Sequence, residues 1–88
     1  MKAFLVELYW PGMTPTLVDG LVARIRQATD NDREPVRYVG CTMTPRDETC
    51  FLRLAATDEA AVHGLIERLG LDGTRVSELV DVPGAPPV

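Results

Sequence analysis

The order of hydrophobic periodicities is the feature that most limits how this chain can fold. Two segments, residues 14–30 and 57–69, place apolar side chains at helical spacing, and both are flanked by segments of strand-forming residues. The strand-like segments are residues 3–9, 36–43, 49–56 and 71–82. The resulting order, βαββαβ, predicts an α+β, ferredoxin-like sandwich in which two helices cover one face of a four-stranded antiparallel sheet.

Local signals predict where the two helices begin and end. Thr14 is a good N-cap, and Pro15 suits the first helical position. The second helix is predicted to begin at Thr57, and Gly70 suits the left-handed conformation that ends a helix. Gly20, inside the first helix, suggests that this helix approaches the sheet closely. The expected buried positions are Leu17, Val18, Leu21, Val22 and Ile25 in the first helix and Ala61, Val62, Leu65, Ile66 and Leu69 in the second.

Length and charge exclude several classes of protein. With 88 residues, the chain has room for one domain, predicted over residues 1–82, and the proline-rich segment 83–88 is expected to be a loosely packed tail. The net charge is −4 and there is no basic stripe, so a nucleic-acid-binding protein is not expected. There is no apolar run long enough to span a membrane and no signal-peptide cleavage site, which predicts a cytoplasmic protein.

The first and third strands are apolar on both faces. In the first strand, Leu5 and Tyr9 alternate with a second apolar set, and in the third strand Phe51 lies opposite Cys50. Because the helices can cover only one face, the other face is expected to have a partner. The simplest partner is a second copy packed sheet to sheet about a two-fold axis, which predicts a homodimer of the dimeric α/β-barrel kind. A small apolar ligand or a different protein are the alternatives.

Short strings spread along the chain form a recognisable order: Val6-Glu7, Pro11-Gly12, Thr49-Cys50-Phe51-Leu52, Ala55, Glu59-Ala60, Gly70-Leu71 and Arg75-Val76-Ser77-Glu78. In their order and spacing, these strings resemble a family of small ferredoxin-like bacterial proteins catalogued as a domain of unknown function, of which one relative is described as nickel-binding or nickel-responsive. The resemblance extends to about residue 82 and implies the same fold, a dimer-like assembly, and nickel or another divalent metal as a possible cofactor.

One helix carries a candidate set of metal ligands. Glu59, His63 and Glu67 are spaced four residues apart, so they share one face of the second helix. An imidazole between two carboxylates could bind a divalent ion through nitrogen and oxygen. The alternative is a solvated helix face, because the apolar positions of this helix turn His63 outward.

The two cysteines form the second candidate metal site. Cys50 shares a strand face with Leu52 and Leu54 and is expected to be a buried, unreactive thiol. If the loop of the hairpin is residues 44–47, Cys41 lies opposite Cys50, and the two sulfurs could bind a soft metal or oxidise. If the loop is residues 45–47, Cys41 lies on the other face with Phe51. We favour the shorter loop.

Glu7 is the candidate catalytic residue. A carboxylate in an apolar strand must form an ion pair, bind something, or titrate with a raised pKa. An ion pair is the favoured interpretation, with Arg37, Arg53 or Arg75 as its partner. Tyr9, Trp10, Tyr38 and Phe51 could surround a ligand beside Glu7, or could pack in a dimer.

Two classes of function follow from these residues. The first is a small dimeric protein that binds a ligand or a metal, nickel being the metal that the resemblance suggests. The second is a cofactor-free enzyme of the oxygenase or cyclase type, with Glu7 as acid or base in an apolar cavity on the sheet face. This second interpretation rests on analogy between folds.

Overall fold

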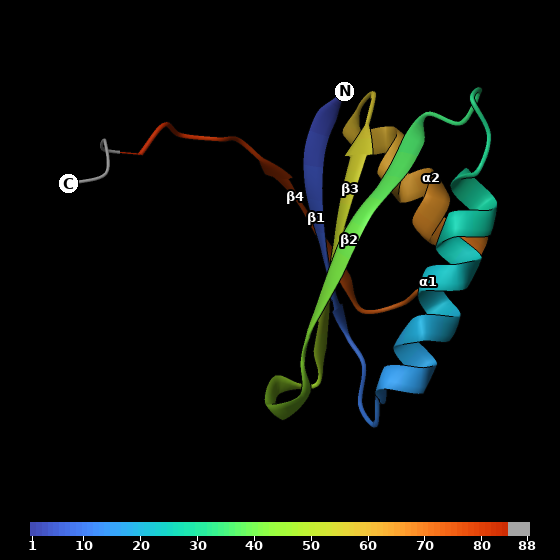
Figure 1. Ribbon diagram of the computed structural model, residues 1–88, viewed down its shortest axis with the longest axis vertical. Coiled ribbons are helices and arrows are strands. Elements are labelled where there is room, and N and C mark those ends of the chain that lie inside the picture. The colour runs from blue at the N-terminus through green and yellow to red at the C-terminus, as the bar shows by residue number, and fades with distance from the viewer. Residues whose placement is uncertain (85–88) are drawn as a thin grey trace.

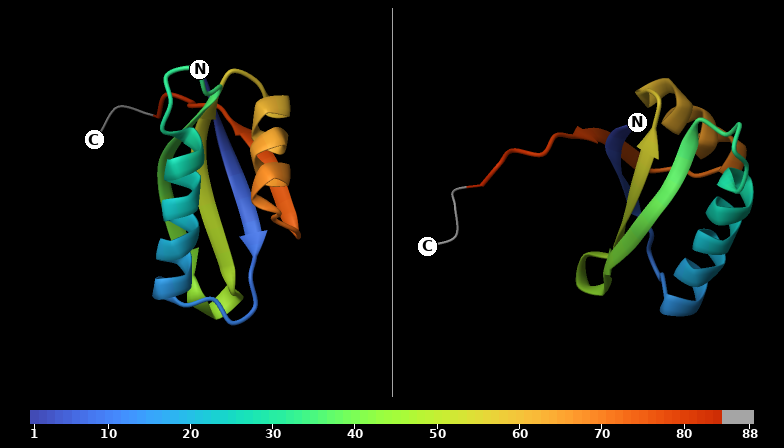
Figure 2. Two further views of the ribbon diagram at one scale, coloured as in Figure 1. Left: turned by 90° about the vertical axis from the view of Figure 1, so that its right-hand side faces the viewer. Right: turned by 45° about the horizontal axis from the view of Figure 1, so that its top comes forward.

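The computed structural model describes residues 1–84 and contains the predicted βαββαβ order (Figure 1). The elements are β1 (Lys2–Tyr9), α1 (Pro15–Thr29), β2 (Val36–Thr44), the 3-10 turn η1 (Pro45–Asp47), β3 (Thr49–Ala56), α2 (Glu59–Leu69) and β4 (Thr74–Leu79). All paired strands are antiparallel, in the order β2-β3-β1-β4. Both helices cover the same face of the sheet (Figure 2), so the ferredoxin-like prediction is confirmed.

The core lies between this sheet face and the two helices. Alternation along β1 places Phe4, Val6 and Leu8 in the core, each at most 5% exposed. The rest of the core consists of Val18, Leu21, Ile25, Val36, Cys50, Leu52, Leu54, Ala56, Val62, Leu65 and Ile66. Consequently no element of residues 1–84 covers the opposite face of the sheet.

The helix ends follow local side-chain chemistry, with one correction. The Thr14 hydroxyl accepts a hydrogen bond from the Leu17 amide at 3.2 Å, as expected of an N-cap. The predicted start of the second helix at Thr57 is wrong, because Asp58 is the cap and accepts from the Ala61 amide at 2.9 Å. A carboxylate is also favoured at the positive end of the helix dipole. Gly70 ends α2 in the left-handed conformation, with φ 67°.

Two expectations for α1 are wrong. Leu17 is 47% exposed, because the buried side of the helix is formed by Val18, Leu21 and Ile25. Gly20 makes no close approach to the sheet, since a Cβ atom built on it would have no atom within 4 Å. The rotation of α1 leaves Leu17 and Gly20 beside open space rather than against the core.

The hairpin between β2 and β3 has a register that neither predicted loop produces. Thr44 pairs with Thr49, so the loop is residues 45–48 and Glu48 adopts a left-handed conformation with φ 50°. The preference for a 45–47 loop is therefore wrong, and Cys41 lies on the helix side with Cys50. Glu48 also anchors the chain after β1, since its carbonyl accepts from the Trp10 amide at 2.7 Å. That tertiary role gives a reason for the extra loop residue.

At its C-terminal end the chain leaves the sheet. The predicted fourth strand, residues 71–82, is shortened to β4, and the following segment leads away from the domain (Figure 1). Of the predicted tail, residues 83 and 84 are exposed, and the remainder lies outside the described residues. No helix in residues 1–84 has both the length and the apolar character needed to cross a membrane.

Candidate functional site

An apolar pocket opens at the end of β1, between α1 and the segment that follows α2. Its volume is about 430 Å³, within the range of small-molecule sites. Its walls include Leu8, Tyr9, Trp10, Leu17, Leu21 and Leu71, with Gly20 as a gap in the helical wall. Leu8 and Leu21 are core residues, whereas Leu17 and Tyr9 are 47% and 59% exposed. The pocket therefore has a rigid apolar floor and a mouth open to solvent.

Arg24 supplies the positive charge of this pocket. Its Nη2 donates a hydrogen bond to the Leu69 carbonyl at 2.8 Å, at the C-terminal end of α2. A cation is favourable there because of the helix dipole, and the bond ties α1 to the last turn of α2. The guanidinium carries five N–H donors, so it has further donors to offer a polar group of a ligand. Asp72, which also lines the pocket, carries the opposite charge.

The five residues predicted to surround a ligand do not converge on one place. Tyr9 and Trp10 line the pocket at the end of β1. Glu7 and Phe51 are cross-strand partners on the uncovered face of the sheet. Tyr38 lies at the β2 edge, on the helix side. Alternation along the strands places Tyr38 on the face opposite to Phe51, whereas Tyr9 and Trp10 are separated from Glu7 because they lie at the very end of β1 and just beyond it.

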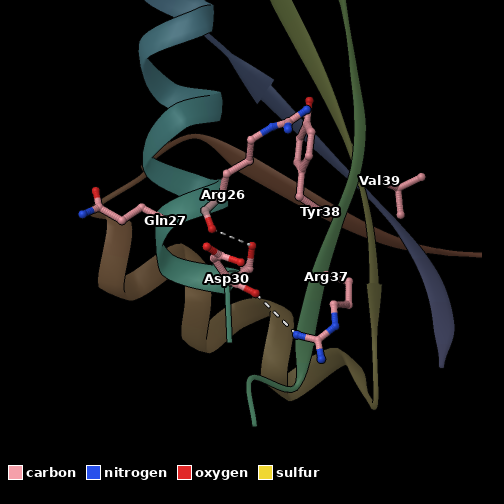
Figure 3. Close-up of a pocket in the computed structure, with 7 residues that line it drawn as sticks. Arg26, Gln27, Asp30, Arg37, Tyr38 and Val39 are labelled. Atoms are coloured by element: carbon pink, nitrogen blue, oxygen red, sulfur yellow. Dashed lines mark hydrogen bonds between the residues drawn. The ribbon is translucent and has the colours of Figure 1, made fainter. Parts of the chain in front are cut away.

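Tyr38 lies beneath a cation at the edge of the sheet (Figure 3). The Arg26 guanidinium is 5.1 Å from the centroid of the Tyr38 ring, within the range of a cation–π contact. Burial raises the pKa of Tyr38 above its usual value. Val39 points to the other side of β2 and is 61% exposed, because a β-bulge lies between Tyr38 and Gly40. These residues form part of a second, more polar cavity of about 560 Å³.

Arg37 has a structural role at this edge. Its guanidinium donates to the carbonyl of Asn31 at 2.6 Å and to that of Asp32 at 3.3 Å, just beyond the end of α1. A third donation goes to the Thr29 carbonyl at 3.4 Å. Arg37 thereby holds the loop that follows α1 against the edge of the sheet, and its guanidinium is engaged there rather than with Glu7.

Glu7 is half-buried on the uncovered face, between Phe51 on β3 and Arg75 on β4. Arg53, on the same face, extends across Gly40 and donates to the Thr42 hydroxyl at 2.8 Å. A Cβ atom at Gly40 would meet the end of the Arg53 side chain, which would have to turn aside. Within residues 1–84, no basic side chain lies within 4 Å of the Glu7 carboxylate, so the expected ion pair is not formed inside one chain.

The helix-borne metal set is not assembled. His63 Nε2 lies 3.2 Å from Glu59 Oε2, and both side chains are more than half exposed on the outer side of α2. In the described part of the chain, no three side chains of the His, Cys, Asp and Glu types converge on a point that could hold a metal ion. A nickel ion at this helix would need Glu67 to move in, or ligands from another molecule.

The two cysteines are brought together on the helix side of the sheet. Cys41 Sγ and Cys50 Sγ are 3.1 Å apart, Cys50 is fully buried and Cys41 is half-buried. Burial, with a smaller contribution from the hydrogen bond to Cys41, raises the pKa of Cys50 to about 12. Cys50 is therefore a neutral core thiol at physiological pH, as the sequence predicts.

We expect stability to fall in alkaline solution because of Cys50. Above the ordinary thiol pKa of 9.0, the unfolded chain loses this proton while the folded chain keeps it up to about 12. The free energy of unfolding should therefore decrease by up to about 1.4 kcal/mol per pH unit in this window. Urea denaturation at pH 8 and pH 10 should show a steeper loss for the wild type than for Cys50→Ala. Equal losses in both proteins would contradict this origin.

The element order and the sheet topology place the chain among ferredoxin-like α+β proteins. A scan against models of known protein families finds no match for the chain, and neither does a search of curated proteins. The sequence interpretation gave no site role to three residues that line the pocket: Arg24, Leu71 and Asp72. Arg24 lies four residues after Gly20, so the two residues share one face of the helix. This spacing is the sequence signal that could have placed Arg24 beside Gly20.

Proposed function

We propose that this protein binds a small, largely apolar molecule in the pocket at the end of β1, and that it does so as a homodimer. The observation that supports binding is the pocket itself, in which apolar walls and aromatic side chains surround one cationic group. A cavity of this kind with few polar groups is the usual form of a ligand site. The apolar surface contributes affinity, and Arg24 orients the ligand.

Arg24 narrows the class of ligand. An apolar body in contact with Trp10, Leu17 and Leu71 would carry an acidic or hydrogen-bond-accepting group at the end nearest the guanidinium. Asp72 would oppose an anion placed on its side of the pocket. The proposed ligand is therefore an aromatic or aliphatic molecule with one acidic end.

The proposed dimer uses the uncovered face of the sheet. Leu5 and Phe51 are half-buried there without a covering layer, and Leu79 is 40% exposed. Glu7 lies on this face without a cation within ion-pair distance in the described residues, and Arg75 stands beside it in the sheet. In a two-fold pair, each Glu7 could meet an arginine of the other copy, which would compensate its desolvation.

We expect Gly20→Leu to abolish ligand binding without harming the fold. The new side chain would extend into the pocket, where a Cβ at this position meets nothing within 4 Å. Leucine is also favoured over glycine inside a helix, by roughly 0.8–1 kcal/mol. Binding can be followed with anilinonaphthalene sulfonate, an apolar anion, because Trp10 is the only tryptophan and lines the pocket. Energy transfer from Trp10 to the probe should saturate in the wild type and be lost in Gly20→Leu.

Gly20→Ala is the matched control, since it brings a similar gain in helix propensity but leaves most of the pocket volume open. It should bind the probe nearly as the wild type does and melt at a higher temperature. Arg24→Gln should bind the anionic probe more weakly than the wild type, because the cation is gone. Retained binding in Gly20→Leu would place the probe elsewhere on the protein and would defeat the proposed site.

A further inference from the structure

We propose that Cys41, Met43 and Cys50 form a binding site for a monovalent, thiophilic metal ion of the Cu(I) type. The site lies on the helix side of the β2–β3 hairpin, where Cys50 is the cross-strand partner of Leu8. Its cavity and the pocket at the end of β1 are bordered by different faces of α1, and the proposal does not depend on the small-molecule binding proposed above.

Register brings the three sulfur-bearing side chains together. Met43 is the direct cross-strand partner of Cys50, and Cys41 is the partner of Leu52, two residues further along β3. All three therefore point to the same face of the sheet. The 3.1 Å separation of the two Sγ atoms confirms that the thiols are in contact.

A cavity gives a metal ion access to these sulfurs. It has a volume of about 350 Å³, lies between α1 and the β2 edge, and is lined by Cys41, Met43, Tyr38 and Arg26, with Val18 and Val22 on the helix side. Cys50 lies behind them, fully buried. An ion entering through the cavity would meet Cys41 and Met43 first and then the second thiol.

The donor set selects a soft ion of low coordination number. Thiolate and thioether sulfurs prefer Cu(I) over hard cations, which take oxygen ligands. A structural zinc site takes four ligands from cysteine, histidine and carboxylates. Within residues 1–84, no third such side chain joins the two cysteines. Two thiolates and a thioether suffice for a monovalent ion that accepts two or three sulfur ligands.

The metal complex would carry one negative charge. Binding exchanges two thiol protons for one monovalent cation, so Cu⁺ and two R–SH give a bis-thiolate complex of charge −1 and two released protons. Arg26 and Asp19 both line the same cavity, so one positive and one negative side chain border that complex, and the Arg26 guanidinium lies over the Tyr38 ring. Without a metal, the buried Cys50 thiol keeps its proton.

A direct disulfide is the competing use of these thiols. Cys41 and Cys50 are diagonal rather than direct cross-strand neighbours, and their Sγ atoms lie 3.1 Å apart. A disulfide bond of about 2.0 Å would bring the sulfurs closer together. An ion bound at about 2.3 Å from each sulfur would move them apart, so both uses require the side chains to rotate, and the experiment below distinguishes them.

The test is an anaerobic titration of the reduced protein with Cu(I) in competition with bicinchoninate, repeated with Ag(I), which has no accessible redox change. The wild type should take up one ion per chain and release two protons, and bound metal should protect Cys41 from iodoacetamide. Cys41→Ser should weaken binding by more than about 100-fold. Loss of an outer-shell partner typically lowers metal affinity by about 10- to 100-fold, and loss of a direct ligand should lower it further. Met43→Leu, which conserves volume, should weaken binding by about tenfold while its thermal melt stays close to that of the wild type.

His63→Ala is the matched control, because it removes the one imidazole of the chain from an exposed helix face. Its Cu(I) affinity should equal that of the wild type. Any of three results would overturn the proposal: no stoichiometric uptake by the wild type, unchanged affinity in Cys41→Ser, or loss of binding in His63→Ala. Formation of an intramolecular disulfide with oxidised glutathione, together with absence of metal uptake, would assign the thiols to redox chemistry instead.

Discussion

Leu5→Glu should convert the proposed dimer into a monomer. Leu5 lies near the middle of the uncovered sheet face, directly opposite Arg53 in the β1–β3 register. Within one chain the new carboxylate gains a favourable cross-strand neighbour. In a two-fold interface, however, each copy loses a buried leucine and must desolvate a charge. The dimer dissociation constant should rise by at least about 100-fold, since every 1.4 kcal/mol is tenfold.

Sedimentation velocity over a range of concentrations measures this change directly. Ala23→Glu is the matched control, because it adds the same charge at an exposed position on α1, away from the sheet face. It should sediment as the wild type does. A wild type that remains monomeric at high micromolar concentration would defeat the proposed dimer, and a dimeric Leu5→Glu protein would move the interface to another surface.

Phe4→Ala should destabilise the fold by about 3–5 kcal/mol, which is a large part of the total stability of a domain of this size. Phe4 is 1% exposed and is among the largest fully buried side chains of the core. Removing its ring leaves a cavity between the sheet and the helices, because the packed neighbours cannot fully collapse into the gap. Urea denaturation followed by circular dichroism gives the change in unfolding free energy.

The other phenylalanine provides an internal comparison. Phe51 lies in the adjacent strand but on the uncovered face, where it is half-buried. At concentrations where the protein is monomeric, Phe51→Ala should lower the free energy of unfolding by less than half as much as Phe4→Ala does. If the proposed dimer forms, the cost of Phe51→Ala should grow with protein concentration while that of Phe4→Ala should not. Equal costs at all concentrations would mean that the two faces are buried alike.

Local chemistry accounts for the parts of this fold that the sequence predicted well. Thr14 caps α1 because a hydroxyl beside the first free amides is favourable in any context. Gly70 ends α2 because few other residues adopt a positive φ at low cost. The outward direction of His63 follows from helical spacing alone. Element order and the identity of the core face of β1 follow from the same short-range rules.

Register and rotation were decided by the tertiary structure. The loop of the β2–β3 hairpin includes Glu48 because that residue also holds the segment after β1, through its carbonyl to Trp10 and its side chain to Gly12 at 2.8 Å. This long-range contact puts Cys41 beside Cys50, and a change of one residue in the register would have turned Cys41 to the other face. No local pattern in the hairpin carries that information.

The pockets depend on tertiary structure for the same reason. Helical spacing predicted that Leu17 would be buried. The rotation of α1 against the sheet instead placed Leu17 and Gly20 at the border of a cavity. Arg24 also lines that cavity, and its side chain is held by a hydrogen bond to the Leu69 carbonyl at the end of α2, which is far from Arg24 in the sequence. Residue types and short-range periodicity therefore determined the elements and their buried sides. The meeting of side chains from distant elements, which creates the candidate sites, was settled by packing.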